Sequence, residues 1–421
     1  MIDLAAAIDL VERTAEPLPP RRQRLADAAG RALAQPVLAD CDSPPFDRAM
    51  MDGFAVCNAD LATAGDEVVE LEVVMDLAAG DVTTVAVRPG TCTRIMTGAP
   101  LPPGADAVVP VECGVGGTAD THAGGHVRLR DDRFRSGQHV GRRGTAFRRG
   151  SEVLRAGDVL TPAAVGLAAE AGATHVLAEP RVRVALLSTG SELVPSDQVP
   201  AHGQTRNSNG PMLAAAVALL AAEPIPLGIA GDRPEAIRAA IAQGLAADVL
   251  VLSGGVSAGD LDLVPGILAA CGVEQVFHKV RLKPGKPVWF GILRRPAAPP
   301  TLVFGLPGNP ASSLVCFELF VRPAIQILAA RPRAAWHLPR AVARLVAPAK
   351  SPPDRPVFLP CRLRSSGSDG LEAEPLPWTG SSDLVGLATA DGLLALPAGG
   401  GRHEPGAEVE VLLGDRARAR H

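Results

Sequence analysis

Residues 247–262 read ADVLVLSGGVSAGDLD, an apolar run that ends in two glycines and two closely spaced carboxylates. The run from Val249 to Leu252 is short, continuous and rich in β-branched residues, which is typical of a strand buried on both faces of a parallel sheet. Gly254 and Gly255 then allow backbone conformations that a Cβ atom would forbid. The stretch is therefore predicted to be a core strand that ends in a tight turn.

Two carboxylates, Asp260 and Asp262, follow that turn, and we expect them to open a helix over residues 261–270. Ligands of open α/β sheets bind beyond the carboxyl ends of the strands, where loop N–H groups and helix N-termini favour anions. Carboxylates at the same place can hold a metal ion. The stretch is thus predicted to form one wall of a ligand site.

The composition indicates a multidomain protein whose partners are small molecules or proteins. A chain of 421 residues is too long for one core and favours about two to four domains. The 41 basic and 45 acidic residues give a formal net charge of −4, which argues against nucleic-acid binding and an electrostatic membrane anchor. Seven cysteines without a CxxC pair indicate reduced thiols in a cytoplasmic protein, with neither disulfides nor zinc. No apolar run approaches the roughly 20 residues of a membrane span.

The first 180 residues alternate between helical and β-rich patterns. Residues 3–36 predict two helices separated by a proline-rich break, the second around residues 25–34, and residues 161–172 predict another. Between them, short strands separated by Gly/Pro turns form a β-rich module. Asp52 begins an Asp-Gly turn and Thr97 follows a strand, so turn formation and backbone capping explain both residues locally.

From residue 182 the sequence repeats strand-turn-helix units whose strands end in glycine and a polar side chain. Ordinary turn chemistry explains each turn alone. Right-handed βαβ crossovers, however, bring the carboxyl ends of parallel strands to one edge of a sheet, so the turns are expected to meet. Acids and lysines gathered there suit a phosphorylated substrate with a divalent cation. The turns are residues 189–192, the Asp232 turn, residues 254–255, the lysines Lys279, Lys283 and Lys286 around residues 284–285, and residues 307–310, after which Ser312 or Ser313 could cap a helix.

Past residue 331, short strands separated by Pro/Gly/Ser turns predict a small β-barrel-like domain. The fold class is therefore multidomain α/β, in which a central parallel-sheet α/β domain is joined by a β-rich module, a linking α/β region and a C-terminal β-barrel-like domain. The predicted domains are residues 1–47 with 141–180 (linking region), 48–140 (β-rich module), 181–330 (central α/β domain) and 331–421 (barrel-like domain).

The most specific motifs are PPFDRAMMDGFAV (44–56), RIMTGAPLPPGADAVVPVE (94–112), LLSTGSEL (186–193), the Asp232 turn, SGGVSAGDLD (253–262), KVRLKPGKP (279–287) and GLPGNPASS (305–313). In this order and spacing they resemble the molybdopterin molybdenumtransferase family, the group of MoeA and the gephyrin E domain, over essentially the whole chain. GGVS alone would also indicate the related adenylyltransferases, which share the central fold.

The resemblance implies an elongated homodimer in which residues 181–330 bind molybdopterin and the linking region contributes to dimerisation. It implies an enzyme that inserts molybdate into adenylylated molybdopterin, releases AMP and uses Mg²⁺. It also implies a site shared between subunits and transient contacts with other molybdenum-cofactor proteins.

The resemblance also assigns site residues by position. Its catalytic positions are Asp52, Thr97, Glu192, Asp232 and Asp262, of which Glu192, Asp232 and Asp262 would bind the metal, while Asp52 and Thr97 would come from the neighbouring subunit. Its substrate-binding positions are Ser188, Gly190, Gly254, Gly255, Ser257, Lys279, Lys283, Lys286, Pro307, Gly308, Pro310, Ser312 and Ser381.

Three segments depart from the family pattern. The family's Arg-x-x-Gly-Glu-Asp is replaced by residues 142–146, which end in Thr145 and Ala146. The family's second arginine near Arg355 is replaced by Pro360, and Arg362 is the residue that could take over its role. The family's Ser-His pair becomes Ser381-Ser382. The alternatives to an efficient transferase are a catalytically weak relative that binds or delivers the cofactor, and a scaffold protein that uses the same fold.

Overall fold

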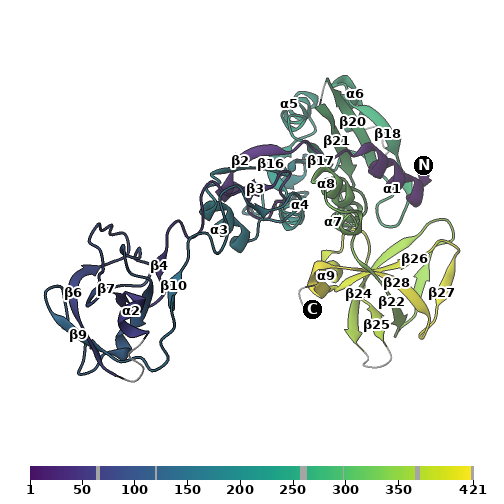
Figure 1. Ribbon diagram of the computed structural model, residues 1–421. Helices are drawn as coiled ribbons and strands as arrows, with labels where there is room; N and C mark the ends of the chain where they lie inside the picture. The colour runs from purple at the N-terminus through teal and green to yellow at the C-terminus, as the bar shows by residue number, and fades with distance from the viewer. Residues whose placement is uncertain (63–66, 119–120, 257–262, 297, 366–369, 419–421) are drawn as a thin grey trace. The chain divides into compact units, whose positions relative to one another are not determined.

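The computed structural model describes residues 1–62, 67–118, 121–256, 263–296, 298–365 and 370–418. The chain forms two compact units, Met1–Pro19 with Glu179–His421, and Pro20–Ala178 (Figure 1). The larger unit holds a six-stranded sheet and a closed five-stranded barrel, and the smaller unit holds a five-stranded sheet. The predicted multidomain α/β class is confirmed.

The six-stranded sheet has the order β16-β13-β17-β21-β20-β18. The first four strands are parallel, as predicted, whereas β20 is antiparallel to both of its neighbours. The apolar run predicted to be a core strand is β17, and all of its residues are buried. The strands are β13 (Arg183–Thr189), β16 (Glu223–Ala230), β17 (Val249–Ser253), β18 (Glu274–His278), β20 (Trp289–Arg295) and β21 (Ala298–Leu306).

Helices cover both faces of this sheet. Side chains alternate along β17, so Val249 and Val251 pack on one face and Leu250 and Leu252 on the other. The first face is covered by α1 (Leu4–Thr14), α4 (Asn209–Leu219), α7 (Pro310–Cys316), the π-helical turn η3 (Phe317–Val321) and α8 (Arg322–Leu328). The second is covered by α5 (Pro234–Gly244) and α6 (Val264–Ala270).

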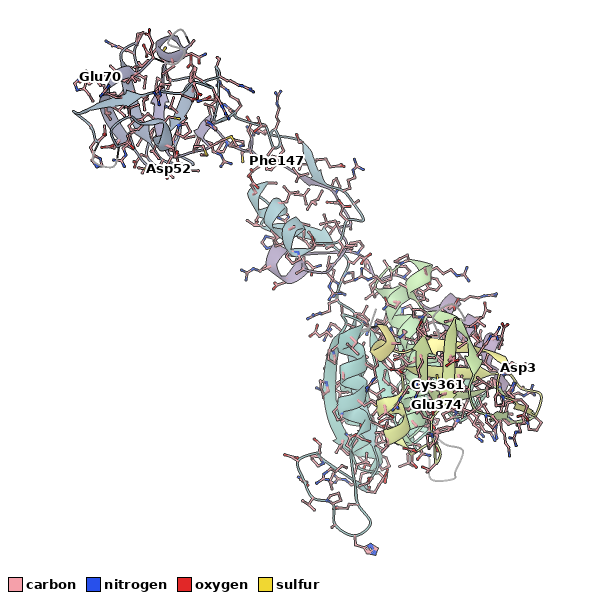
Figure 2. All side chains as sticks on the ribbon, turned by 90° about the horizontal axis from the view of Figure 1, so that it is seen from below. Asp3, Asp52, Glu70, Phe147, Cys361 and Glu374 are labelled. Carbon is pink, nitrogen blue, oxygen red and sulfur yellow. The ribbon has the colours of Figure 1, made fainter. Side chains whose placement is uncertain are left out.

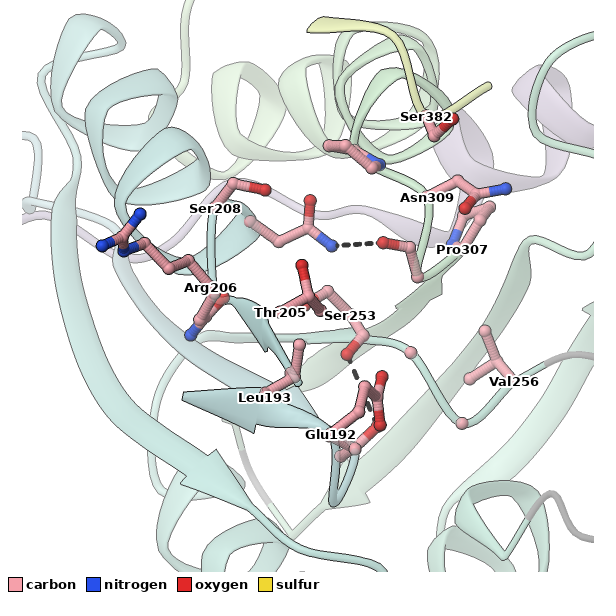
Figure 3. A pocket seen from close by; sticks show the side chains of 18 of the residues that line it. Glu192, Leu193, Thr205, Arg206, Ser208, Ser253, Val256, Pro307, Asn309 and Ser382 are labelled. Atoms are coloured by element: carbon pink, nitrogen blue, oxygen red, sulfur yellow. Dashed lines mark hydrogen bonds between the residues drawn. The ribbon is translucent and has the colours of Figure 1, made fainter. Parts of the chain in front are cut away.

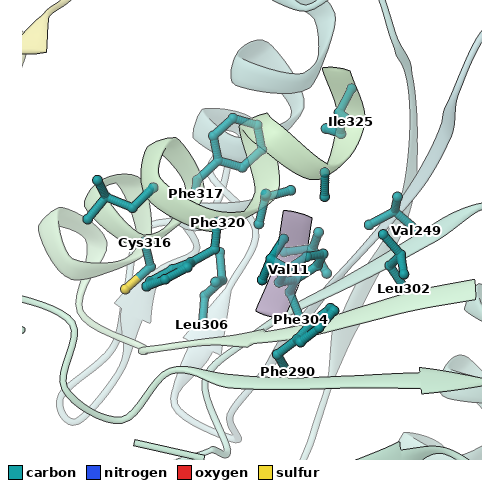
Figure 4. Close-up of a cluster of buried hydrophobic side chains, with 14 of the residues drawn as sticks. Val11, Val249, Phe290, Leu302, Phe304, Leu306, Cys316, Phe317, Phe320 and Ile325 are labelled. Atoms are coloured by element: carbon teal, nitrogen blue, oxygen red, sulfur yellow. The ribbon is translucent and has the colours of Figure 1, made fainter. Parts of the chain in front are cut away.

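Aromatic side chains fill the core on the first face (Figure 4). Phe290 and Phe304 stack with ring centroids 4.8 Å apart, and Phe277 lies 5.4 Å from Phe290. The helix Pro310–Leu328 packs against this cluster. It is long and apolar enough to cross a membrane, but 83% of its most apolar window is buried inside the protein, as in the core helix of a globular domain.

The C-terminal strands close into the barrel β22-β25-β24-β26-β28. Cys361 and Glu374, both labelled in Figure 2, lie on the adjacent strands β24 and β25. The barrel strands are β22 (Arg340–Leu345), β24 (Val357–Ser365), β25 (Leu371–Pro375), β26 (Gly392–Leu396) and β28 (Glu408–Leu413), with the additional pair β23 (Ala349–Ser351) and β27 (Gly401–His403) and the helices α9 (Leu384–Thr389) and α10 (Asp415–Arg418). Shorter elements of this unit are β1 (Ile2–Asp3), β14 (Leu193–Val194), β15 (Thr205–Arg206), β19 (Val280–Arg281) and the 3₁₀ turn η4 (Arg333–Ala335).

The smaller unit contains the β-rich module, whose sheet has the order β8-β5-β7-β6-β9. The predicted strands of this module are all present. They are β5 (Gly53–Val56), β6 (Val69–Leu77), β7 (Thr91–Ile95), β8 (Ala107–Pro110) and β9 (His126–Leu129), with α2 (Asn58–Leu61), the 3₁₀ turn η2 (Val111–Cys113) and the pair β4 (Arg48–Ala49) and β10 (Val140–Gly141).

The linking region corrects one prediction. The helix expected around residues 25–34 is absent from this fully described segment, which holds a single 3₁₀ turn and isolated β-bridges at Ala32 and Leu33, directly after a strand that ends at Arg24. Pairing with the strand β12 holds the chain extended, and burial of Leu25 and Ala28 in a local core outweighs helix propensity. The elements are β2 (Arg21–Arg24), η1 (Leu25–Ala28), β3 (Val37–Leu38), β11 (Glu152–Leu154), the predicted helix α3 (Pro162–Glu170) and β12 (His175–Ala178).

Replacing Phe304 by alanine tests the importance of the aromatic core. The substitution removes a fully buried ring that stacks on Phe290, and we expect it to lower the free energy of opening of the sheet by about 3–5 kcal/mol. Native-state hydrogen exchange of the β17 and β21 amides measures this change strand by strand. Val342→Ala is the matched control, since Val342 is 65% exposed. Unchanged protection in Phe304→Ala would contradict this account of the core.

Candidate functional site

The strand ends predicted to meet do meet at one edge of the six-stranded sheet. Thr189 of β13 pairs with Ala230 of β16, and Ser253 of β17 pairs with Leu306 of β21. The antiparallel strand β20 begins at the same edge, because Trp289 pairs with Gly305. The turns that follow or precede all these strands therefore lie beside one another.

A first cleft of about 920 Å³ opens at this edge (Figure 3). Its walls come from the turns after β13, β16, β17 and β21 and from the start of α4. Of the predicted site residues, the cleft is lined by Gly190, Glu192, Asp232, Gly254, Gly255, Pro307, Gly308 and Pro310.

The turn after β17 requires its two glycines. Gly254 has φ +91°, and a Cβ atom there would lie 2.5 Å from the carbonyl oxygen of Thr189. Gly255 has φ +65°, and a Cβ atom there would lie 2.7 Å from Cγ2 of Val264. Side chains at these positions would therefore be strained and would clash, so the bare main chain forms this part of the cleft wall.

Glu192 and Asp232 supply the negative charge of the first cleft, and both are exposed. Asp232 is held by a reciprocal contact: the Ser191 N–H donates to Asp232 Oδ2 at 3.0 Å, and the Asp232 N–H donates to Ser191 Oγ at 2.9 Å. This contact ties the turns after β13 and β16 together. Ser257, Asp260 and Asp262, the other predicted residues of the SGGVSAGDLD stretch, lie outside the described residues.

A buried polar layer supports the floor of the first cleft. Ser188 is buried and donates to Asn207 Oδ1 at 3.1 Å, and it does not line the cleft. Asn207 Oδ1 also accepts the Gly210 N–H, while Asn209 Nδ2 donates to the carbonyl oxygen of Gly308 at 2.8 Å. Neither asparagine was among the predicted site residues. The signal for both is the NSNGP stretch (207–211) at the start of the α4 segment, which places short polar side chains at a helix N-terminus.

A second cleft of about 520 Å³ adjoins the first, and the two share Pro287, Pro307 and Asn309. The described residues that line the second cleft include Lys283, Lys286 and Arg355 but no aspartate or glutamate. Its cationic side chains therefore face no carboxylate of the lining. The other polar side chains of this wall are those of Asn309, Ser312, Trp378, Thr379 and Ser381.

Lys279 lies apart from both sets of lining residues. It has φ +67° at the junction of β18 and β19, where its N–H donates to Val288 and its carbonyl accepts from Ile2. The structure thus brings two of the three predicted lysines to a cleft.

The second cleft is built on the seam between the sheet and the barrel. The Lys283 N–H donates to Pro356 O at 3.0 Å, and the Phe358 N–H donates to Lys283 O at 2.8 Å. On the other side, the Ala311 N–H donates to Ser381 O at 3.1 Å, and Asn309 Nδ2 donates to Ser381 Oγ at 2.8 Å. The barrel therefore fixes the lysine turn and the start of α7 at the same time.

The start of α7 corrects a further prediction. Its N-cap is Asn309, so Ser312 and Ser313 lie inside the helix and cap nothing. Ser313 Oγ instead donates to Pro307 O at 2.6 Å, which closes the tight turn before the helix. Ser312 is buried and lines the second cleft.

In the smaller unit, Asp52 and Thr97 contact each other directly on the β-rich module, where Figure 2 labels Asp52. Asp52 Oδ1 accepts two hydrogen bonds from Thr97, from the hydroxyl at 2.6 Å and from the main-chain N–H at 2.7 Å. These bonds, the hydroxyl first, hold the pKa of Asp52 below its usual value. Asp52 is exposed, so the pair presents an ionised carboxylate to solvent.

Two of the departures from the family pattern have local structural roles. In the smaller unit, Thr145 Oγ1 donates to the carbonyl oxygen of Arg142 at 2.9 Å, and the Ala146 N–H donates to the carbonyl oxygen of Ser43 at 2.9 Å. In the barrel, Pro360 is buried in β24, and its carbonyl oxygen accepts from the Leu376 N–H.

The remaining residues of these three segments, Arg362 and the Ser381-Ser382 pair, differ in whether they line a cleft. Arg362, considered as a substitute for the missing arginine, is exposed and lines neither cleft. The Ser381-Ser382 pair is divided, because Ser381 lines the second cleft and Ser382 the first.

Comparison with known proteins gives matches along the whole chain. Three family models match in order: the MoeA N-terminal region (domain I and II) over residues 2–172, a probable molybdopterin binding domain over residues 185–327, and the MoeA C-terminal region (domain IV) over residues 342–413. The molybdopterin molybdenumtransferase of Bacillus subtilis is 34% identical, covering 92% of this chain and 88% of that protein. The molybdopterin molybdenumtransferase of Nostoc is 35% identical, covering 90% of this chain and 80% of that protein. A solved structure of the molybdopterin biosynthesis protein MoeA from Pyrococcus horikoshii has a TM-score of 0.71 and 29% identity, covering 98% of this chain and 99% of that one.

The contact between Thr97 and Asp52 is tested by Thr97→Val. The variant removes the hydroxyl donor, and we expect the pKa of Asp52 to rise toward its ordinary value of 3.8. Because the folded pKa is depressed, the ionised carboxylate stabilises the module fully above pH 3.8 and loses this effect as the pH falls through the folded pKa. The variant should show a weaker loss of stability in that acid range. A ¹³C NMR titration of the Asp52 carboxyl measures the pKa, with Thr97→Ser as the control that keeps the hydroxyl. An unchanged pKa in Thr97→Val would rule out the hydroxyl as its main cause.

Proposed function

This chain belongs to the molybdopterin molybdenumtransferase family, and we propose that it inserts molybdate into adenylylated molybdopterin with release of AMP. Relatives that match nearly the whole chain are named molybdopterin molybdenumtransferase, and the chain is an enzyme of molybdenum cofactor biosynthesis. The substrates in the proposal are adenylylated molybdopterin and molybdate, and the products are molybdenum cofactor and AMP.

One observation carries the proposal: a cleft lined by two carboxylates and one arginine, Arg206, adjoins a cleft lined by two lysines and one arginine, and the two clefts share Pro287, Pro307 and Asn309. The first contains two carboxylates together with glycine turns and the N-terminus of α4, which suits a cation and a phosphorylated ligand. The second contains cationic side chains and hydroxyls, which suit a tetrahedral dianion such as molybdate. A reaction between an adenylylated substrate and molybdate needs these two kinds of site side by side.

The carboxylates of the first cleft fit a magnesium ion. Mg²⁺ keeps several waters and is usually bound through one or two carboxylates together with substrate phosphates. Glu192 and Asp232 supply such a pair, and within the described part of the chain no group of three or more His, Cys, Asp or Glu residues gathers that would form a cage made by protein alone. Asp262, assigned as the third ligand, stays a sequence prediction. When bound, the ion would neutralise charge on the phosphoryl oxygens.

The other residues of the clefts would orient the substrates and stabilise charge. The main chain of the residue 254–255 turn and the start of α4 would hold the phosphates, and Lys283, Lys286 and Arg355 would hold molybdate. Ser312 and Ser381 would add hydroxyl donors. Positioning the two reactants and neutralising their charges are the main effects that such a reaction requires.

We extend the proposal to the assembly from the family resemblance. The protein would be a cytoplasmic homodimer in which Asp52 and Thr97 of one subunit complete the site of the other, and it would contact other molybdenum-cofactor proteins transiently. In this assembly the linking region would join the domains and contribute to the dimer (residues 1–47 with 141–180), and the β-rich module would carry Asp52 (48–140). The central domain would bind molybdopterin (181–330), and the last domain would form the barrel (331–421).

The function is tested by following AMP release from adenylylated molybdopterin. We expect release that requires both molybdate and Mg²⁺, and we expect Asp232→Asn to slow it by about 100-fold, the usual size of one electrostatic contact in a transition state. Asp197→Asn is the matched control, because Asp197 is exposed and lies outside the cleft lining. Tight binding of the substrate without AMP release would instead support a protein that only binds or delivers the cofactor.

The shared site is tested by subunit complementation. Asp52→Asn and Asp232→Asn should each be almost inactive as homodimers of twice the chain mass by light scattering. When the two variants are co-expressed, we expect about a quarter of the wild-type rate, since half of the randomly formed dimers are mixed and each mixed dimer keeps one intact site. If each site were built within one chain, the mixture would stay inactive. A stable monomer would also refute the assembly.

A further inference from the structure

The three tryptophans of the chain differ in whether the indole N–H group has a hydrogen-bond acceptor. Trp289 Nε1 donates to Gln275 Oε1 at 2.9 Å, and Trp336 Nε1 donates to Arg331 O at 2.8 Å. Trp378 Nε1 is buried and finds no hydrogen-bond partner among the described residues. A buried donor without a partner is costly and calls for an explanation, such as a ligand.

Trp378 lines the second cleft, together with Lys283, Lys286 and Arg355. Arg355 Nε is a second buried donor of this wall without a hydrogen bond among the described residues, although it forms an ion pair with Asp354 Oδ1 at 3.6 Å. Both groups can only donate. The wall thus offers donors to a ligand whose atoms accept.

The loop around Trp378 is fixed from both sides. Asp383 Oδ2 accepts from the N–H and the hydroxyl of Thr379 at 3.0 and 3.1 Å, while its Oδ1 caps α9 through the Val385 N–H at 2.9 Å. A Cβ atom added at Gly386 would lie 3.7 Å from Trp378 Cδ1, so the indole packs against the bare main chain of α9. The ring is therefore held in place before any ligand arrives.

We propose that the Trp378 indole N–H is a direct hydrogen-bond donor to the tetrahedral oxyanion held in the second cleft. This inference rests on the proposed function for the identity of that anion, molybdate. Molybdate carries only acceptor oxygens, and a neutral donor adds a directed contact to the charge that Lys283, Lys286 and Arg355 supply. Because a hydrogen bond is directional, the contact would select an anion with an oxygen at the right corner of a tetrahedron, which charge alone would not do.

The proposal predicts that binding of molybdate is visible in Trp378 itself. Titration of the full-length wild-type protein with sodium molybdate should change the tryptophan fluorescence, and the change should disappear in Trp378→Phe. Trp378→Phe keeps an aromatic ring and removes the N–H, so we expect its molybdate affinity by calorimetry to fall about 10- to 100-fold, the effect of one hydrogen bond to a charged group. Trp336→Phe is the matched control and should keep both the affinity and the fluorescence change.

A measurement on the wild-type chain keeps the test independent of whether the variant folds. With ¹⁵N-labelled tryptophan, the Trp378 indole resonance should shift on addition of molybdate, while those of Trp289 and Trp336 should not. Wild-type affinity in Trp378→Phe, or a stationary Trp378 resonance while molybdate binds, would overturn the inference and leave the proposed function intact. Absence of both molybdate binding and AMP release in the wild-type protein would refute the proposed function as well.

Discussion

The two main-chain hydrogen bonds between Lys283 and the barrel hold together the part of the molecule where the two clefts adjoin. They fix the turn that carries Lys283 and Lys286 against the start of β24, and Arg355 lies directly before that strand. The contact between Ser381 and the start of α7 secures the opposite side of the cleft. The cationic wall is therefore assembled from two domains, and neither the sheet nor the barrel contains it alone.

This arrangement places opposite charges close together without pairing them. The described lining of the first cleft has the carboxylates of Glu192 and Asp232 against the single cation Arg206, and the lining of the second is positive through its lysines and arginine. Arg355 pairs with Asp354 at 3.6 Å, but among the described residues no ion pair joins Lys283 or Lys286 to Glu192 or Asp232, so these four charges remain available to a ligand. Of the three shared residues, Pro287 and Pro307 have no polar side-chain group and Asn309 is uncharged, so no charged side chain lies where the two linings meet.

Much of the sheet edge could be predicted from the sequence, because local patterns determine it. The buried strand β17 and its two glycines follow from an apolar run and from positive φ angles, and the meeting of strand ends follows from βαβ topology. What depends on contacts between distant segments could not be predicted. Strand β2 forms through pairing with β12, Lys279 lies at the junction of β18 and β19 outside both cleft linings, and the place of Trp378 in the second cleft depends on how the barrel docks.

The docking of the barrel has a consequence for how this protein can diverge from its relatives. Three of the hydrogen bonds across the seam join main-chain atoms, those of Lys283 with Pro356 and Phe358 and that of Ala311 with Ser381. Such bonds do not depend on which side chains stand at these positions. Mutations can therefore accumulate in the barrel over evolution, in a strand at Pro360 and in a loop at Ser382, without changing how the barrel packs on the sheet. The side chains on the barrel side of the cleft can then change, while the main-chain hydrogen bonds that position the barrel stay the same.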